Sequence, residues 1–307
     1  FRFEGNLARL DGTIDGGDAS DLLQTSDGID SVLLTGADAG TATVNLGLTD
    51  FVSVENVDLR SGNDTFTVAD GATLTGTLSG GFGDDELVGP AAGATFNVTA
   101  DNSGELRNAA DTADLLGTGT ATRGFSSIEN LTGGVGDDTF NLSANVTLAG
   151  DLDGGLGTNL LTLGSGASIG GDVDNVDVTV VIDQMSGINA GVAVDNILVQ
   201  INNSQLEVVV NGSSNTFFVP TGTSTVTLDI QSEGGADNLT IDYRTESNAE
   251  PLPGDIQFNT TDGNDRVRLI GTTGRDVTYE PVLVPGPVTP QRELTIGGLT
   301  TDRLVHL

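Results

Sequence analysis

Apolar residues alternate with threonine and serine over short runs along the chain. Phe66 and Val68 form one such run, and Leu74, Leu78 and Leu87 belong to the next ones. A period of two places successive side chains on opposite faces of a strand, so that one face of each run can be buried. Glycine, aspartate and asparagine, which favour tight turns, separate the runs. The pattern predicts an all-β chain of short strands with very little helix.

An internal duplication organises the first half of the chain. The segment FVSVENVDLRSGNDTF (51–66) aligns without a gap with FSSIENLTGGVGDDTF (125–140), at an offset of 74 positions. The alignment extends over residues 51–89 and 125–163, with 16 identities in 39 positions. Duplications of this kind are typical of repeat architectures.

A shorter period lies within each copy, because a glycine-rich corner that ends in Asp or Asn recurs 21 positions later. The two pairs of corner residues are Asp64 with Asp85 and Asp138 with Asn159. A repeat of this length is typical of solenoids, in which each coil buries its apolar face against its neighbours. We therefore expect a parallel β-helix or β-solenoid with coils of roughly 21 residues over residues 1–190.

The copy offset of 74 positions exceeds three such coils by 11, so an insertion is required. The segment ELRNAADTADLLG (105–117) has a suitable size and position and is the one segment with a helix-like composition. We expect it to hold the inserted residues.

A second β-rich module is predicted over residues 191–307, either hairpin-containing or a continuation of the solenoid. The segment QLEVVVNGSSNTFFVP (205–220) places two β runs around Asn211-Gly212, which is a hairpin signal. The corner pattern returns in GGADNLTI (234–241) and DGNDRVRL (262–269). Four of the eight prolines lie within residues 280–290, which predicts a loop.

The corners are the strongest chemical signal in the sequence. GGFGDDELV (80–88) and GGVGDDTFN (133–141) match the nonapeptide pattern GGxGxDxUx completely, and GGLGTNLLT (154–162) departs from it only at Asn159. Glycine permits positive φ and close backbone approach, and aspartate supplies the oxygen ligands of which calcium needs six to eight. The predicted calcium ligands are Asp64, Asp84, Asp85, Asp137, Asp138, Asn159, Asp237 and Asp265. The competing interpretation is that these corners are turns whose side chains cap backbone amides without metal.

On these motifs the chain resembles the calcium-binding repeats of RTX toxins and the β-strand repeat segments of giant bacterial surface proteins. The matching residues are Gly80, Gly81, Gly83 and Asp85 in one corner and Gly133, Gly134, Gly136 and Asp138 in another. RTX sites form between tandem nonapeptides, whereas these corners are single copies 21 positions apart. The pattern of β runs and corners in the C-terminal part resembles repeat modules of very long secreted proteins of planctomycetes and related bacteria. The resemblance implies an extracellular, calcium-binding surface protein.

The net charge of the chain limits the kinds of partner that it can bind. All 11 basic residues are arginine, and the 44 acidic residues give a formal net charge of −33. Such a chain repels phosphate backbones and anionic membranes, which argues against nucleic-acid binding. No apolar stretch is long enough to insert into a membrane. The acidic surface favours an extracellular or high-salt setting where cations screen it.

The sequence offers little for catalysis, and we expect no enzyme. His306 is the only histidine and cysteine is absent, so neither a histidine-dependent triad nor a thiolate site can be assembled. Arg60 and Arg123 lie near the corners and keep a β-helix polysaccharide lyase as one alternative.

The expected function is a structural segment of an extracellular or cell-surface protein. Solenoids present open sheet ends, which favour stacking into a homo-oligomer, filament or surface layer. The other alternative is an adhesin for a glycan or another surface ligand, which should display a regular ladder of threonines on one face.

Overall fold

The computed structural model of the 307-residue chain consists of strands, turns and bends, and its described part contains no α-helix. None of the described segments is a helix long and apolar enough to cross a bilayer. The prediction of an all-β chain is therefore confirmed. The described residues are 1–4, 10, 12–117, 124–164, 166–182, 195–202, 205–217, 226–234, 237–242, 244, 255–262, 266–270, 277–281, 292–297 and 302–306.

The chain divides into two compact units. The first comprises Phe1–Leu161 and Ser168–Val176, and the second comprises Thr162–Ala167 and Asp177–Leu307. The predicted module boundary near residue 190 falls within residues 183–194, which lie outside the described part of the chain.

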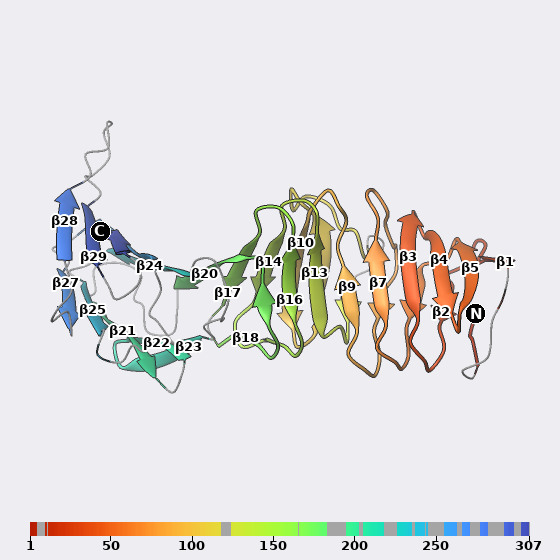
Figure 1. Cartoon of the computed structure of the whole chain (residues 1–307), viewed down its shortest axis with the longest axis horizontal. Coiled ribbons are helices and arrows are strands. Elements are labelled where there is room, and N and C mark those ends of the chain that lie inside the picture. Colours follow the sequence, from red (N-terminus) through yellow and green to blue (C-terminus); the bar gives the residue numbers. More distant parts are fainter. Residues whose placement is uncertain are drawn as a thin grey trace. The chain divides into compact units, whose positions relative to one another are not determined.

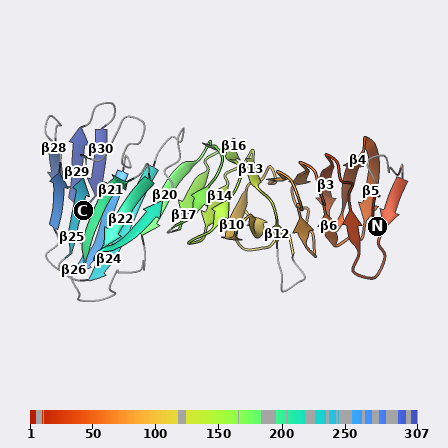
Figure 2. The same ribbon diagram turned by 90° about the horizontal axis from the view of Figure 1, so that it is seen from below.

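The first unit contains two main sheets in which most strands run parallel (Figure 1, Figure 2). One sheet has the strand order β1-β5-β4-β3-β7-β9-β13-β16-β19, and the other has β2-β6-β8-β12-β11-β10-β14-β17, while β15 pairs with β18. The strands are β1 (Gly12–Asp15), β2 (Leu22–Gln24), β3 (Ser31–Gly36), β4 (Ala39–Val44), β5 (Gly47–Val52), β6 (Asn56–Asp58), β7 (Thr65–Val68), β8 (Leu78–Ser79), β9 (Glu86–Val88), β10 (Ala94–Ala100), β11 (Ser103–Asn108), β12 (Phe125–Ser126), β13 (Asn130–Gly134), β14 (Thr139–Leu142), β15 (Thr147–Leu148), β16 (Leu152–Gly155), β17 (Leu160–Leu163), β18 (Ser168–Ile169) and β19 (Val173–Asp174).

The predicted period of 21 appears directly in the strand register. Thr65 pairs with Glu86, and Leu131 pairs with Leu152, which in turn pairs with Val173. Each of these partners lies 21 positions further along the chain. Repeats of this length therefore stack with equivalent residues side by side, as parallel pairing requires.

Two repeats are longer because they carry antiparallel additions. Ser31 pairs with Thr65, 34 positions later, and the strands β4 and β5 occupy the extra length. Glu86 pairs with Asn130, 44 positions later, and the β10–β11 hairpin lies in between. The expected insertion at 105–117 belongs to this second addition, but it starts as β11 rather than as helix. Pairing with β10 outweighs its helix-like composition.

The two sequence copies occupy different sheets, which explains their offset. Strand β7 of the first copy lies in the sheet of β9 and β13, whereas its counterpart β14 lies in the sheet of β10 and β17. The reverse holds for the next pair of corresponding strands, because β6 of the first copy lies in the sheet of β2 and β8, whereas its counterpart β13 lies in the sheet of β9 and β16. The copies are therefore displaced by half a repeat. Their offset of 74 positions consists of one 21-residue repeat from Thr65 to Glu86, the 44-residue repeat from Glu86 to Asn130, and the nine positions from Asn130 to Thr139.

The core of the first unit is aliphatic and aromatic. Phe96 and Phe140, from the paired strands β10 and β14, stack with ring centroids 4.7 Å apart. Burial alternates along the strands, as in β4 and β7, where every second residue is buried. The period-two pattern in the sequence thus marks the inward positions correctly.

The second unit also consists of strands. One run of neighbours is β20-β24-β26-β30-β29-β28 and the other is β23-β22-β21-β25-β27. Its strands are β20 (Asp177–Ile182), β21 (Asn196–Asn202), β22 (Gln205–Val210), β23 (Ser213–Phe217), β24 (Val226–Gly234), β25 (Asn238–Asp242), β26 (Asp255–Asp262), β27 (Arg266–Ile270), β28 (Val277–Pro281), β29 (Arg292–Gly297) and β30 (Asp302–His306).

The predicted hairpin of the second unit is confirmed. Strands β22 and β23 pair antiparallel around Asn211 and Gly212. Both turn residues have positive φ, 48° and 87°, as a two-residue hairpin turn requires. The predicted loop at 280–290 begins at the end of β28, and residues 282–291 lie outside the described part.

Candidate functional site

The two acids of each Gly-Asp-Asp corner have different environments. Asp84 and Asp137 are exposed, whereas Asp85 and Asp138 are buried, with 0% and 1% of their surface accessible. Asp64 and Asn159 are buried in the same way, each directly before a strand. The predicted metal ligands therefore separate into an outer and an inner set.

The inner acids form a ladder across successive repeats, which we call the Asp30–Glu129 ladder (Asp30, Asp64, Asp85 and Glu129). The amide of Asp30 donates to Oδ1 of Asp64 at 2.7 Å, and the amide of Asp64 donates to Oδ1 of Asp85 at 2.9 Å. The amide of Asp85 donates to Oε2 of Glu129 at 3.0 Å. Each buried amide at a corner is therefore satisfied by an acid of the next repeat.

A second ladder, the Ala94–Asn159 ladder (Ala94, Asp138 and Asn159), follows the same rule. The amide of Ala94 donates to Oδ1 of Asp138 at 2.7 Å, and the amide of Asp138 donates to Oδ1 of Asn159 at 2.9 Å. The second oxygen of Asp138 accepts from the Gly134 amide, and Nδ2 of Asn159 donates to the Asn175 carbonyl. Both side chains of this predicted pair are already engaged in hydrogen bonds.

The second unit repeats the arrangement. Asp195 and Asp237 are buried in front of β21 and β25, and the Asp195 amide donates to Oδ1 of Asp237 at 2.8 Å. Asp265, the remaining predicted ligand, lies outside the described residues.

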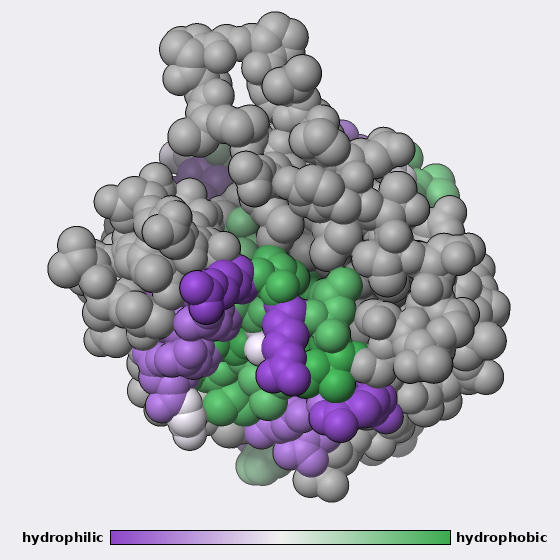
Figure 3. All heavy atoms as spheres, turned by 90° about the vertical axis from the view of Figure 1, so that its left-hand side faces the viewer, coloured by the Kyte–Doolittle hydropathy of each residue, from purple (hydrophilic) through white to green (hydrophobic). Residues whose placement is uncertain are grey.

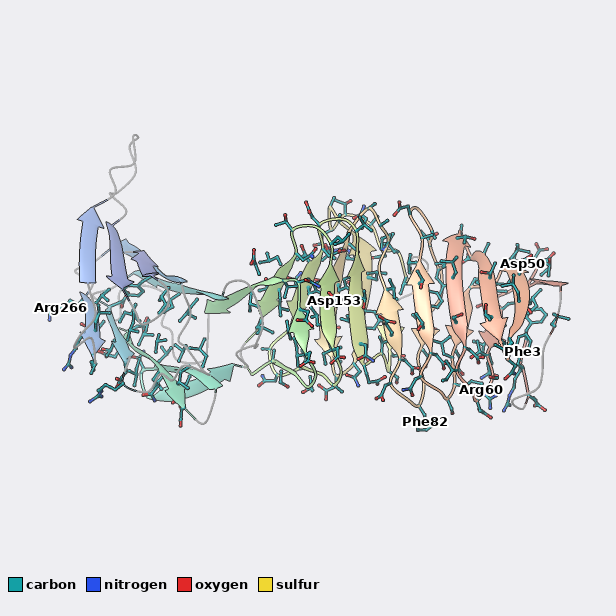
Figure 4. All side chains as sticks on the ribbon, viewed as in Figure 1. Phe3, Asp50, Arg60, Phe82, Asp153 and Arg266 are labelled. Carbon is teal, nitrogen blue, oxygen red and sulfur yellow. The ribbon has the colours of Figure 1, made fainter. Side chains whose placement is uncertain are left out.

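The outer acids form hydrogen bonds at the turn surface. The amide of Asp84 donates to Oδ1 of Asn63 at 3.3 Å, and Oδ1 of Asp137 accepts from the Thr158 amide at 2.8 Å. Both contacts again join residues 21 positions apart. In the corner that contains Asp84, Phe82 lies between the second and third glycines and projects into solvent with 82% of its surface exposed (Figure 4).

Glycines are required at the corners because the turns stack directly on one another. A Cβ on Gly80 would lie 2.6 Å from Oδ2 of Asp85 and 1.9 Å from the carbonyl oxygen of Ser127. A Cβ on Gly83, whose φ is +143°, would lie 1.5 Å from the carbonyl oxygen of Gly62 in the adjacent repeat. The GGxG pattern is thus explained by packing between repeats.

One carboxylate oxygen of Asp64 and one of Asp85 take no part in the hydrogen bonds of the ladder. Oδ2 of each is buried and accepts no hydrogen bond, and Oδ2 of Asp21 shares this state. Burial away from water raises the pKa of Asp64 to about 7 and that of Asp85 to about 6, although the amide hydrogen bond to each opposes the shift. Burial also raises the pKa of Asp138. Ionisation of these corner acids in the folded chain therefore costs free energy.

Calcium fits these residues only in part. Among the described residues, no three histidine or acidic side chains gather closely enough to hold a metal ion. Oδ2 of Asp85 and the Ser127 carbonyl oxygen both lie close to the position that a Cβ on Gly80 would take, and two oxygens brought this near one another favour a cation or a proton between them. The remaining ligands of a calcium ion would have to be carbonyls and water.

Sequence reasoning missed several ladder members. Asp30 and Asp195 directly precede strands and have the same burial as the predicted corner acids. Glu55 and Glu129 occupy matching positions in the two copies, and each accepts the amide of an aspartate in another repeat, Asp21 for Glu55 and Asp85 for Glu129. The Glu-Asn dipeptide shared by both copies was the available signal.

The arginine considered for lyase chemistry is engaged in structure. Arg60 pairs with Asp27 at 2.9 Å and donates to the Phe3 carbonyl at 3.2 Å. Arg123 lies outside the described residues, and His306 belongs to β30.

Comparison of the chain with models of known protein families, with curated protein sequences and with solved structures found no match. The function is therefore inferred from the ladders themselves.

Proposed function

We propose that this chain is a structural segment of an extracellular or cell-surface repeat protein, with a β-solenoid over its first unit, and that copies associate into a filament or surface layer. The observation that carries the proposal is the Asp30–Glu129 ladder. In it the buried amide of each corner is satisfied by the next repeat.

Each repeat thus depends on the next one for a hydrogen-bond acceptor. Such dependence suits a structural segment that holds other domains apart or resists tension. A single repeat has neither a closed core nor a partner for its corner amide, so it gains stability only by stacking. Addition of repeats then extends the segment without new chemistry. The acidic side chains at the turn surface, such as Asp84 and Asp137, keep that surface hydrated and favour surroundings rich in cations.

Light scattering and negative-stain electron microscopy of the purified chain test association. We expect assemblies larger than one chain whose proportion grows with protein concentration. A monodisperse monomer at every concentration, with and without calcium, would contradict the assembly part of the proposal.

Calcium binding at Asp64 and Asp85 is the second candidate function. It is favoured by one specific observation, the buried Oδ2 atoms that accept no hydrogen bond. Oδ2 of Asp85 and the Ser127 carbonyl oxygen, which both approach Gly80, are the groups that would hold an ion at Asp85, and Oδ2 of Asp64 would offer a separate oxygen in the neighbouring repeat. Calcium would supply positive charge where desolvation disfavours the carboxylates.

Thermal melting with excess calcium and with chelator tests this candidate. We expect calcium to raise the melting temperature of the wild type, and Asp85→Asn to abolish the increase. Asp138→Asn is the matched control, because both oxygens of Asp138 already accept amide hydrogen bonds. A melting temperature that calcium leaves unchanged would remove the candidate.

A glycan-binding role finds less support. The outward row of the first sheet runs through Thr41, Leu33, Thr67, Val88 and Thr132. Apolar residues interrupt the threonines, so this row is not the regular ladder expected for such a surface.

A further inference from the structure

Strand β27 (Arg266–Ile270) forms one end of a sheet in the second unit. It pairs in parallel with β25, and among the described residues no strand pairs with its other edge. The amide of Arg266 donates to the Asp237 carbonyl. Because the hydrogen-bonding groups of successive strand residues point to opposite edges, those of Val267 and Leu269 point to the open edge.

The inward side chains of this sheet lose burial at β27. Ile197, Leu239 and Val267 occupy one inward register, and the first two are 2% and 0% exposed. Val267 is half-buried, and Leu269 is half-buried next to the fully buried Ile241. Figure 3, which looks onto this side of the molecule, shows apolar surface exposed between strongly hydrophilic side chains. A further strand is needed to complete the burial.

The outward side chains of β27 are basic in an acidic chain. Arg266 and Arg268 are both exposed, and neither forms an ion pair with a described residue. Arg266 is the labelled side chain at the edge of the second unit in Figure 4. An edge of this kind attracts an acidic strand and disfavours pairing with a second β27, which would bring arginines together.

The chain itself carries a strand with the required properties. Strand β1 is the last strand of its own sheet among the residues that the structure describes. It pairs in parallel with β5 and presents buried Ile14 beside exposed Asp15. The amide of Gly16 donates to the Val52 carbonyl, so the groups of Thr13 and Asp15 point away from β5. The exposed residues Asp18 and Asp50 add negative charge around it.

We infer that copies of this chain join head to tail by parallel pairing of the β27 edge of one copy with the β1 edge of the next. In the register that the free backbone groups allow, Val267 lies opposite Ile14 and the Arg268 side chain lies opposite Asp15. The added strand covers Val267, and the ion pair selects the acidic end over another β27. This inference rests on the proposed assembly and names the surfaces that produce it.

Disulfide trapping tests the register, because the chain contains no native cysteine. In this register Thr13 lies opposite Arg266. Mixing the single variants Thr13→Cys and Arg266→Cys under mild oxidation should give a covalent dimer of the two, since paired strands bring Cα atoms within disulfide range. Thr13→Cys mixed with Thr132→Cys, on the interior strand β13, is the control and should give none.

Charge reversal tests the ion pair by light scattering. Arg268→Asp should weaken association by about tenfold, because it places two like charges opposite each other. The double variant Asp15→Arg with Arg268→Asp should restore association, which a merely misfolded edge would not do.

The outcomes separate the two proposals. If the wild type associates while Arg268→Asp associates equally well and no disulfide forms, this interface is wrong and the assembly proposal stands. If the wild type does not associate at all, both are overturned.

Discussion

The amide of Asp64 donates a hydrogen bond to Oδ1 of Asp85, the equivalent residue 21 positions further along the chain, at 2.9 Å. Both residues are buried, so the bond replaces water for a backbone group that would otherwise be unsatisfied. Asp85 therefore accepts the amide of the previous repeat with its side chain and donates its own amide to the next repeat. Substitutions at a corner should consequently destabilise the neighbour as well.

Substitution of Asp85 tests the ladder. Asp85→Ala removes the acceptor of a buried amide, which costs about 1–3 kcal/mol in unfolding free energy. Asp85→Asn keeps that acceptor, removes a charge that burial disfavours, and places an amide beside the Ser127 carbonyl, as Asn159 does beside the Asn175 carbonyl. We expect the asparagine variant to be at least as stable as the wild type above about pH 6 and clearly more stable than the alanine variant.

Urea unfolding of the three proteins checks this order. The matched control is Asp84→Ala, since Asp84 is the exposed neighbour and its substitution should change stability by less than about 0.5 kcal/mol. Equal losses for Asp84→Ala and Asp85→Ala would show that the ladder does not contribute.

Glycine substitutions test whether the turns stack as closely as described. Gly71 and Gly83 both have positive φ, +74° and +143°, but a Cβ meets nothing within 4 Å at Gly71 and lies 1.5 Å from the Gly62 carbonyl oxygen at Gly83. Gly71→Ala should cost about 1 kcal/mol through backbone strain alone. Gly83→Ala should cost several times more, because two repeats must separate. Similar melting temperatures for the two variants would contradict the stacking.

Much of the first unit could be predicted from the sequence, because the relevant signals are local. Period-two burial and the corner spacing of 21 follow from side-chain direction and turn conformation, as does the Asn211-Gly212 hairpin of the second unit. The exchange of the two copies between sheets could not be predicted. It depends on the β10–β11 hairpin, whose pairing is a tertiary preference that overrides the helix-like composition of residues 105–117.

The candidate site was predictable only in its inner positions. The corner pattern fixes aspartate at Asp85 and Asp138 and leaves the positions of Asp84 and Asp137 open, but it does not show that the first two are buried and the other two exposed. That separation follows from strand parity, because the residue just before a strand faces inward. Glu129 supports Asp85 from 44 positions away, across an addition whose length the sequence does not reveal.

Engineered cysteines test the stacking of repeats within one chain. Thr67 pairs with Val88, and Val88 pairs with Thr132, all on the outward face. Thr67→Cys with Val88→Cys should form an intramolecular disulfide, because parallel neighbours are about 4.8 Å apart. Thr67→Cys with Thr132→Cys spans two strand spacings and should remain reduced. Mass spectrometry after mild oxidation distinguishes the two, and the reverse result would disprove the register.

Stability should fall as pH rises through the range in which the corner acids titrate. The pKa of Asp64 is about 7 and that of Asp85 about 6 in the folded chain, against an ordinary value of 3.8. Between about pH 4 and pH 7 the folded state therefore binds more protons than the unfolded state. The contribution of these protons is complete below the ordinary value and is lost as the pH passes the raised values.

Urea unfolding across this pH range gives the slope. Growth of the net charge also lowers stability with rising pH, so the wild-type slope alone does not identify Asp64. Asp64→Asn removes one titrating group while it keeps the Oδ1 acceptor of the Asp30 amide, and it should flatten the slope. Asp84→Asn removes an exposed charge and should leave most of the slope intact. If both variants change the slope equally, the effect comes from net charge, and the buried Oδ2 of Asp64 is not its source.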